Sequence, residues 1–207
     1  MKEIFLNPNV LACILAYLIG AIPFGLLLVK QFAKIDIRQE GSKSIGATNV
    51  LRVLKQQNNK MAKKLAIATI ALDGLKGFLP VLITKLMGFS FDTQLSVALF
   101  AVVGHCFSPY LKFHGGKGVA TGAGALLLFL PIELAIALAV WFIVGKVLKI
   151  SSLASLLAVA ALLISMFLLN PDNLSIKAPV CIITFIIVYK HTPNIIRLFK
   201  GKESKVI

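Results

Sequence analysis

Three polar segments, rich in glycine and basic residues, interrupt an otherwise apolar chain and could together bind phosphate groups. They span residues 41–52, 113–121 and 191–203. Glycine permits tight turns in which several backbone N–H groups point at one oxyanion. Arginine adds a planar guanidinium suited to phosphate, and lysine adds a point charge. These residue types indicate anion chemistry, and the elements between the segments must bring them together.

The first segment carries neutral and cationic groups that suit a phosphate. Ser42, Thr48 and Asn49 offer neutral hydrogen bonds, and Arg52 offers a bidentate fork. A helix that begins near Thr48 would add the free N–H groups of its first turn. A flexible polar loop with an N-capping threonine is the alternative interpretation.

The second segment places a lysine within a glycine run at the start of a predicted helix. Lys117 follows Gly115 and Gly116 and precedes Gly118. A nucleotide P-loop is excluded, because Leu111 stands where that motif needs glycine and Gly118 where it needs serine or threonine. A generic phosphate cradle is the preferred interpretation, and a helix-joining turn with a snorkelling lysine is the alternative.

The third segment combines a histidine, an amide and charges around a proline. Pro193 suits the first turn of a helix. His191 and Asn194 lie three residues apart and could face one pocket, and His191 is a candidate general base. The alternative is an interfacial histidine, with Arg197 and Glu203 as solvated charges.

Further polar residues fall inside predicted membrane spans. Asp73 and Lys76 lie one helical turn apart, either as a self-satisfied pair or with Lys76 lining an anion pocket and Asp73 orienting it. Ser152 and Ser155 are also one turn apart, and helix packing is the commoner reason for such serines.

The sequence lacks the signatures of several other reactions. His105 is followed five residues later by Tyr110, and His114 by Val119, so no HxxxxD acyltransferase motif is present. There is no GxSxG nucleophile elbow and no metal-ligand cluster. If acyl transfer occurs, the acyl donor should therefore arrive already activated.

The composition is that of a helical membrane protein. Hydrophobic residues make up 58% of the 207 residues and charged residues 14%, whereas soluble domains have about 45–50% and about 25%. We interpret the net charge of +14 mainly as a consequence of basic loops on one side of a membrane. The basic surface would also attract anionic headgroups and phosphorylated substrates.

The apolar runs predict an all-α polytopic protein in which residues 1–207 form a single domain of about seven transmembrane helices. The predicted spans are 9–29, 66–87, 92–108, 119–130, 131–148, 152–169 and 176–190. Pro131 and Glu133 supply the break between the fourth and fifth spans, because proline disrupts the preceding helix. Six spans is the alternative count.

The basic residues predict an N-terminus outside and a C-terminus in the cytoplasm. Of 22 Lys and Arg residues, 18 fall in the four segments assigned to the inside, which are 30–65, 109–118, 146–151 and 190–207. Only Lys2, Lys85 and Lys177 lie outside, and Lys76 lies within a span. This topology places all three polar segments at the cytoplasmic face.

Taken together, the segments resemble the motifs of the bacterial acyl-phosphate:glycerol-3-phosphate acyltransferase (PlsY) family. The matching stretches are GSKSIGATNVLR (41–52), DGLKG (73–77), GHCFSPYLKFHGGKGVAT (104–121) and HTPNIIRLFKGKE (191–203). The resemblance implies an enzyme of bacterial phospholipid synthesis in the cytoplasmic (inner) membrane. Such enzymes transfer a fatty acyl group from acyl phosphate to the 1-hydroxyl of sn-glycerol 3-phosphate, without cofactor, metal or covalent acyl-enzyme, giving 1-acyl-glycerol 3-phosphate and phosphate.

The resemblance also implies roles for individual residues and a partner. It carries over Ser42, Arg52, Lys117, His191 and Asn194 to the substrate-phosphate and reaction centre, and Ser155 as a weaker candidate. Together with the residue chemistry above, we predict His191, Asn194 and Lys117 as catalytic and Ser42, Asn49, Arg52, Gly115, Gly116 and Lys117 as phosphate-binding. Lys76, Asp73 and Glu203 are further candidates. An acyl-phosphate-producing enzyme could dock transiently at the basic face, and no nucleic acid is expected.

One stretch departs from the family pattern. The first motif usually reads Gly-Ser-Gly-Asn, whereas this chain has Lys43 and Ser44 at the third and fourth positions. The two substitutions predict a different turn and remove an amide side chain.

Two other function classes compete with the enzyme. A transporter or flippase for a phosphorylated lipid would explain the basic loops, but it predicts an inverted repeat that the sequence does not show. A non-catalytic anion-binding scaffold would tolerate Arg52→Lys, whereas a bidentate phosphate site would not. Acyl chain length, oligomeric state and the choice between His191 and substrate phosphate as base stay open.

Overall fold

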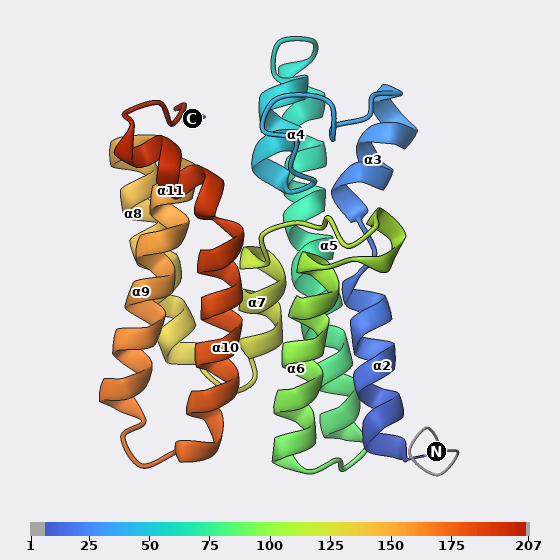
Figure 1. Ribbon diagram of the computed structural model, residues 1–207, viewed down its shortest axis with the longest axis vertical. Helices are drawn as coiled ribbons and strands as arrows, with labels where there is room; N and C mark the ends of the chain where they lie inside the picture. The colour runs from blue at the N-terminus through green and yellow to red at the C-terminus, as the bar shows by residue number, and fades with distance from the viewer. Residues whose placement is uncertain (1–6, 206–207) are drawn as a thin grey trace.

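The computed structural model describes residues 7–205, and its regular structure is helical. Figure 1 shows the elements in chain order. They are α2 (Pro8–Gly20), α3 (Phe24–Ala33), α4 (Ala47–Leu54), α5 (Asn59–Leu86), α6 (Phe91–Cys106), the 3-10 turn η1 (Pro109–Leu111), α7 (Val119–Leu126), α8 (Pro131–Leu148), α9 (Ser151–Leu169), α10 (Leu174–Lys190) and α11 (Thr192–Phe199).

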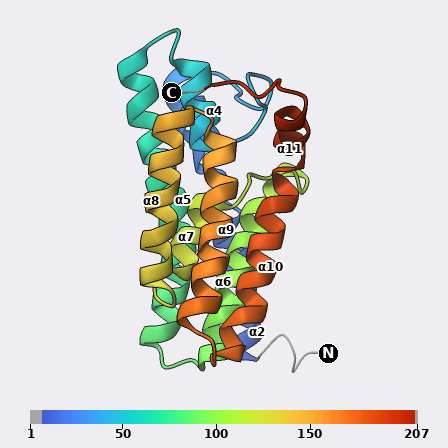
Figure 2. The ribbon, with the colours of Figure 1, turned by 90° about the vertical axis from the view of Figure 1, so that its left-hand side faces the viewer.

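The long helices run side by side along one axis (Figures 1 and 2). The short helices α4 and α11 and the C-terminus lie at one end, and the N-terminus lies at the other. Large apolar side chains point outward along the length of the bundle, including Ile67, Phe142 and Phe185, which are 67%, 62% and 70% exposed. Water would not favour such a surface, whereas lipid does.

Within residues 7–205, five helical stretches are long and apolar enough to cross a membrane. A sixth is counted if α10 and α11, which bend by 56° at their junction, form one span. The expected span 119–130 is instead the eight-residue helix α7, which extends only about 12 Å, far less than the bilayer core of about 30 Å. The count of seven is therefore not confirmed. The predicted break is confirmed, because α7 ends at Leu126 and α8 begins at Pro131.

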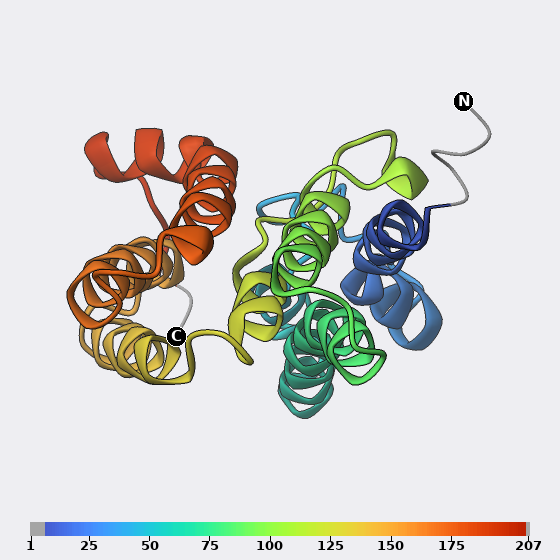
Figure 3. The same cartoon turned by 90° about the horizontal axis from the view of Figure 1, so that it is seen from below.

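Seen along the bundle axis, α8, α9 and α10 form one group and α2, α3, α5 and α6 form another, with α7 between them (Figure 3). Glycine allows α7 to press directly on α5. A Cβ added at Gly77 would lie 2.1 Å from the Thr121 carbonyl oxygen, and one at Gly124 would lie 2.0 Å from that of Gly74. Small residues serve such close helix contacts in membranes. These close contacts between α5 and α7 fix the position of α7, and therefore also the position of the preceding loop, which carries Lys117.

Candidate active site

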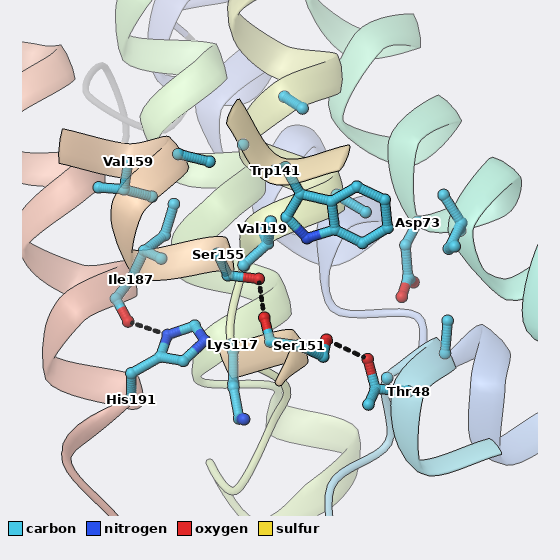
Figure 4. Close-up of a pocket in the computed structure, with 18 of the residues that line it drawn as sticks. Thr48, Asp73, Lys117, Val119, Trp141, Ser151, Ser155, Val159, Ile187 and His191 are labelled. Atoms are coloured by element: carbon cyan, nitrogen blue, oxygen red, sulfur yellow. Dashed lines mark hydrogen bonds between the residues drawn. The ribbon is translucent and has the colours of Figure 1, made fainter. Parts of the chain in front are cut away.

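A cavity of roughly 470 Å³ lies below the end of the molecule that holds α4 and α11. It has a polar mouth and an apolar interior. The mouth is lined by Ser42, Arg52, Lys117, Ser152, His191 and Glu203, and the interior by Leu126, Leu134, Trp141, Val159, Leu162 and Ile183. Figure 4 shows Lys117 and His191 near Ser151 at the polar side and Trp141 across the cavity. The three distant polar segments thus meet at one opening.

Glu203 is the hydrogen-bonding centre of the mouth. Its carboxylate accepts from Ser152 Oγ at 2.8 Å, from Asn194 Nδ2 at 2.6 Å and from Arg197 Nε at 2.6 Å. Burial acts to raise the pKa of Glu203, but the hydrogen bonds from Arg197, Asn194 and Ser152 outweigh it and leave the pKa below its ordinary value. Glu203 is thus a fixed anion that joins α9, α11 and the C-terminal tail.

Three cations surround this carboxylate. Arg52 Nη2 donates to Ser204 Oγ at 3.1 Å, so the tail also reaches α4. Burial lowers the pKa of Lys117 to about 8; the Glu203 charge opposes this shift, and the charges of Arg197 and Arg52 add to it. Burial also lowers the pKa of Arg52. One carboxylate against Arg52, Lys117 and Arg197 leaves an excess of positive charge, as an anionic ligand requires.

His191 sits at the junction of α10 and α11 and is 2% exposed. Its Nδ1 lies 2.8 Å from the carbonyl oxygen of Ile187. A carbonyl only accepts, so Nδ1 carries the hydrogen, and Nε2 of the neutral ring is left as an acceptor. Asn194 N–H donates to the His191 carbonyl, and both side chains line the cavity.

The serines at the start of α9 extend the polar wall. Ser151 Oγ lies 3.0 Å from Thr48 Oγ1, which ties α9 to α4, and Ser155 Oγ donates to the Ser151 carbonyl at 3.0 Å (Figure 4). Sequence reasoning missed Ser151 and weighed Ser152 as a packing residue. A serine pair following a basic loop was the available signal for both. Trp141 had no signal in the sequence.

Asn49 is placed differently from its predicted role as a phosphate ligand. Its Nδ2 donates to the carbonyls of Ile37, Glu40 and Ser44 at 2.8–3.1 Å, and its Oδ1 accepts from Ser42 N. The side chain is 1% exposed. Because its donors are used within the loop, Asn49 holds the first segment in shape, and its side-chain N–H groups are not available to a ligand.

The predicted cradle of Gly115 and Gly116 amides is also corrected. Gly115 N–H donates to the Cys106 carbonyl at 3.2 Å, and Gly116 N–H to the His105 carbonyl at 2.9 Å. Both N–H groups therefore cap the end of α6 and face away from the cavity. Gly118, at φ +87°, lines the cavity instead and turns the chain into α7.

Lys76 does not line the cavity as one interpretation expected. Its Nζ donates to the Ile22 carbonyl at 2.7 Å, between α2 and α3, and lies 5.6 Å from the centre of the Phe24 ring. Asp73, 2.7 Å from the Lys76 ammonium, does reach the cavity wall. The pair is thus buried at the back of the site.

Lys43 adopts a left-handed backbone conformation in the first segment. Its φ is +59°, the left-handed conformation that costs a non-glycine residue about 1–2 kcal/mol. Glycine adopts this conformation without that cost, and the expected change of turn relative to Gly-Ser-Gly-Asn stays a prediction.

Comparison with known proteins identifies the family. Residues 10–201 match the family model described as glycerol-3-phosphate acyltransferase. The glycerol-3-phosphate acyltransferases of Campylobacter concisus and Campylobacter lari are 57% and 59% identical to this chain, over 96% of it and 99% of each relative.

Solved structures agree with the sequence comparison. Two crystal structures of PlsY, an integral membrane glycerol 3-phosphate acyltransferase, in its glycerol 3-phosphate and lysophosphatidic acid forms, superpose with TM-scores of 0.86 and 0.84 at 32% identity. Each alignment covers 96% of this chain, and 96% and 95% of the respective structures. A cationic mouth on an apolar cavity, in a helical membrane protein with these relatives, leads to one conclusion: the chain belongs to the glycerol-3-phosphate acyltransferase (PlsY) family.

Proposed function

We propose that this enzyme transfers a fatty acyl group from acyl phosphate to the 1-hydroxyl of sn-glycerol 3-phosphate, as the first acylation of bacterial phospholipid synthesis. The observation that carries the proposal is the joining of a cationic mouth to an apolar cavity. Such a site suits two phosphates and one hydrocarbon tail. The names of the relatives support glycerol 3-phosphate as the acyl acceptor.

The reaction needs no covalent intermediate on the enzyme. The 1-hydroxyl oxygen attacks the carbonyl carbon of the mixed anhydride, the bond from that carbon to the phosphate oxygen breaks, and phosphate leaves with the bonding pair. Two anionic substrates repel each other, so cations must hold them together. Arg52 and Lys117, which line the cavity, lower this repulsion and hold the reacting groups close.

The hydroxyl proton has two possible acceptors at this mouth. Nε2 of His191 is free to accept one, with the ring held by the Ile187 carbonyl. A phosphate oxygen of the substrate is the other, and the family resemblance favours this substrate-assisted route. In that case His191 and Asn194 would orient glycerol 3-phosphate.

The acyl tail would enter from the bilayer through the side of the bundle. Ile70 on α5, Leu127 after α7 and Leu138 on α8 line the cavity, and each is also 45–57% exposed at the surface. Their side chains therefore border an apolar lateral opening between α5 and α8. A lipid-like donor could load there while its phosphate reaches the mouth.

We assign the mouth to the cytoplasmic face of the inner membrane. The basic segments 30–65, 146–151 and 190–205 lie toward that end, and 109–118 lies on the same side of the cavity, as the positive-inside bias requires. Glycerol 3-phosphate would then arrive from the cytoplasm, and an acyl-phosphate-producing enzyme could dock transiently at the same face.

Purified protein in detergent, supplied with palmitoyl phosphate and glycerol 3-phosphate, tests the proposal. We expect phosphate release that depends on glycerol 3-phosphate and yields 1-palmitoyl-glycerol 3-phosphate. Intact acyl phosphate under these conditions would eliminate this donor. Substituting palmitoyl-coenzyme A should give no product, and product with that thioester would contradict the requirement for an activated anhydride.

A further inference from the structure

A buried cluster of ionisable side chains lies behind the loop that carries Lys117, and the proposed chemistry does not use it. Asp73 Oδ1 lies 2.7 Å from Lys76 Nζ and 3.8 Å from His105 Nδ1. None of the three side chains is more than 7% exposed. The separation of 3.8 Å is too long for a hydrogen bond, and within residues 7–205 His105 Nδ1 has no hydrogen-bond partner. Such groups inside spanning helices are costly and usually serve a function.

Gly116 rests directly on the His105 ring. A Cβ added at Gly116 would lie 2.1 Å from His105 Nε2, and the Gly116 N–H donates to the His105 carbonyl at 2.9 Å. Both the backbone carbonyl and the ring of His105 thus hold Gly116 in place. Lys117 is the next residue, so the place of Gly116 decides where the Lys117 side chain begins.

The other side of the cluster is anchored in a different part of the fold. Lys76 donates to the Ile22 carbonyl at 2.7 Å while it pairs with Asp73. Asp73 is therefore held by a lysine that is itself fixed between α2 and α3. Lys76, Asp73 and His105 therefore lie in a row between Ile22 and Gly116, with 3.8 Å between Asp73 Oδ1 and His105 Nδ1 as the longest separation.

We propose that Asp73 and His105 are positioning residues that set the place of Gly116 and, through it, the direction in which Lys117 enters the cavity. The inference rests on the proposed function, in which Lys117 holds substrate phosphate. A shift of one ångström in the loop would carry the ammonium with it, and displacements of that size cost about 10²-fold in rate.

The contact between Gly116 and the His105 ring can be tested by introducing a steric clash there and then removing it with a second substitution. Gly116→Ala should lower kcat/KM by about 10²-fold, because the new Cβ meets the His105 ring. His105→Ala in the same protein removes the ring and should restore kcat/KM at least about tenfold, but not to the unmodified value, because the ring that positions Gly116 is then missing. No recovery in the double variant would overturn the proposal.

Gly115→Ala is the matched control. A Cβ at Gly115 would lie 2.0 Å from the His105 carbonyl oxygen, which is backbone and survives substitution of the side chain. His105→Ala should therefore not rescue Gly115→Ala. Equal rescue of both glycine variants would mean that the ring has no specific contact with Gly116.

A second double-mutant cycle separates an effect on the direction of the Lys117 side chain from an effect on the stability of the fold. If Gly116→Ala acts through Lys117, it should change kcat/KM less than about threefold in a Lys117→Ala background. Equal losses in both backgrounds would overturn the proposal. Should Gly116→Ala fail to fold, Asp73→Asn, which keeps the side-chain shape, replaces it in the cycle.

The outcomes also distinguish this inference from the proposed function. Absence of turnover in the unmodified protein would contradict the proposed function. The contact between Gly116 and the His105 ring could then still be tested by melting temperature, which His105→Ala should restore in the Gly116→Ala variant. Normal turnover of the unmodified protein without rescue would remove the inference alone.

Discussion

At the scale of single residues, the mouth is a balance of charge around one carboxylate. Glu203 accepts three hydrogen bonds and holds Arg197 and Asn194 in place. Arg52 and Lys117 remain available to a ligand at the same opening. A substrate phosphate would thus meet donors whose positions are already set, and such preorganisation favours both binding and catalysis.

Lys117 should make substrate binding depend on pH in the alkaline range. With a pKa of about 8, its ammonium is charged below that pH and loses its charge above it. The KM for glycerol 3-phosphate should therefore rise between pH 7 and pH 9.5. Lys117→Arg should remove the inflection, because arginine stays charged. A KM that is flat in the unmodified protein would contradict the assignment.

Lys117→Ala should abolish most activity while leaving the fold intact. Loss of one preorganised donor lowers turnover by about 10²–10³-fold. The melting temperature and membrane insertion should be unchanged. Normal turnover would remove Lys117 from the site.

Glu203→Gln should destabilise the folded protein, since Arg197 would lose its charged partner. Hydrogen bonds to charged groups contribute about 1.5–3 kcal/mol, and a lower melting temperature in detergent would report the loss. Because the pKa of Glu203 is lowered on folding, its contribution is present at neutral pH and disappears as pH falls through the folded-state pKa. The difference between the two proteins should therefore vanish in acid.

Lys202→Gln is the control for the Glu203 substitution. Lys202 is exposed, and within residues 7–205 its hydrogen bond runs from its backbone N–H to the Arg197 carbonyl. We expect no change in melting temperature, and an equal fall in both variants would show that the tail contributes through its backbone rather than through Glu203.

At the scale of elements, short helices position the site and long ones contain the cavity. Helix α4 carries Arg52, α11 carries Asn194 and Arg197, and α7 begins just after Lys117. Each is eight residues long, too short to be stable alone. Their positions depend on the packing of α5, α9 and α10, which in turn makes the site sensitive to that packing.

Trp141 on α8 should report occupation of the apolar cavity. It is the one tryptophan in the chain and lines the cavity wall. Addition of 1-palmitoyl-glycerol 3-phosphate should shift or quench its fluorescence, whereas glycerol 3-phosphate alone should change it much less. Equal fluorescence changes with both ligands would mean that the acyl tail does not lie in the cavity beside Trp141.

A neighbouring position provides the fluorescence control. Phe142 is 62% exposed on the outer surface. In a Trp141→Phe, Phe142→Trp protein the indole faces outward, and its emission should not respond to the lipid. A change in the emission of this outward-facing tryptophan would mean that the lipid alters the detergent micelle rather than occupying the cavity.

At the scale of the whole molecule, polarity is separated along the bundle axis. The first and third polar segments lie at the end that holds α4 and α11, the second lies nearer the middle of the bundle at the start of α7, and α2 begins at the opposite end (Figure 1). Apolar side chains cover the sides. Only a fold that returns α6, α9 and α11 to one end can gather residues so distant in sequence.

Cysteine labelling tests the proposed orientation. In a background without Cys13, Cys106 and Cys181, Lys202→Cys should resist an impermeant maleimide in intact cells and react after lysis. Lys177→Cys, at the opposite end, should react in intact cells. The reverse pattern would place the mouth outside.

The sequence by itself determined the membrane class, the break at Pro131 and the residues from which the mouth is built. These properties follow from apolar runs, from proline geometry and from residue chemistry, all of which are local. Arg52, Lys117, His191 and Asn194 were predicted and do line one cavity. Their exact roles remain predictions.

Only the tertiary structure decided which groups stay free for a ligand. The donors of Asn49, Gly115 and Gly116 suit phosphate by type, yet carbonyls brought close by the fold occupy them. Glu203 became the centre of the mouth because the tail folds back onto α9 and α11. Competition for a hydrogen-bond donor depends on the path that the loop or the tail takes in space, and residue types along the sequence do not specify that path.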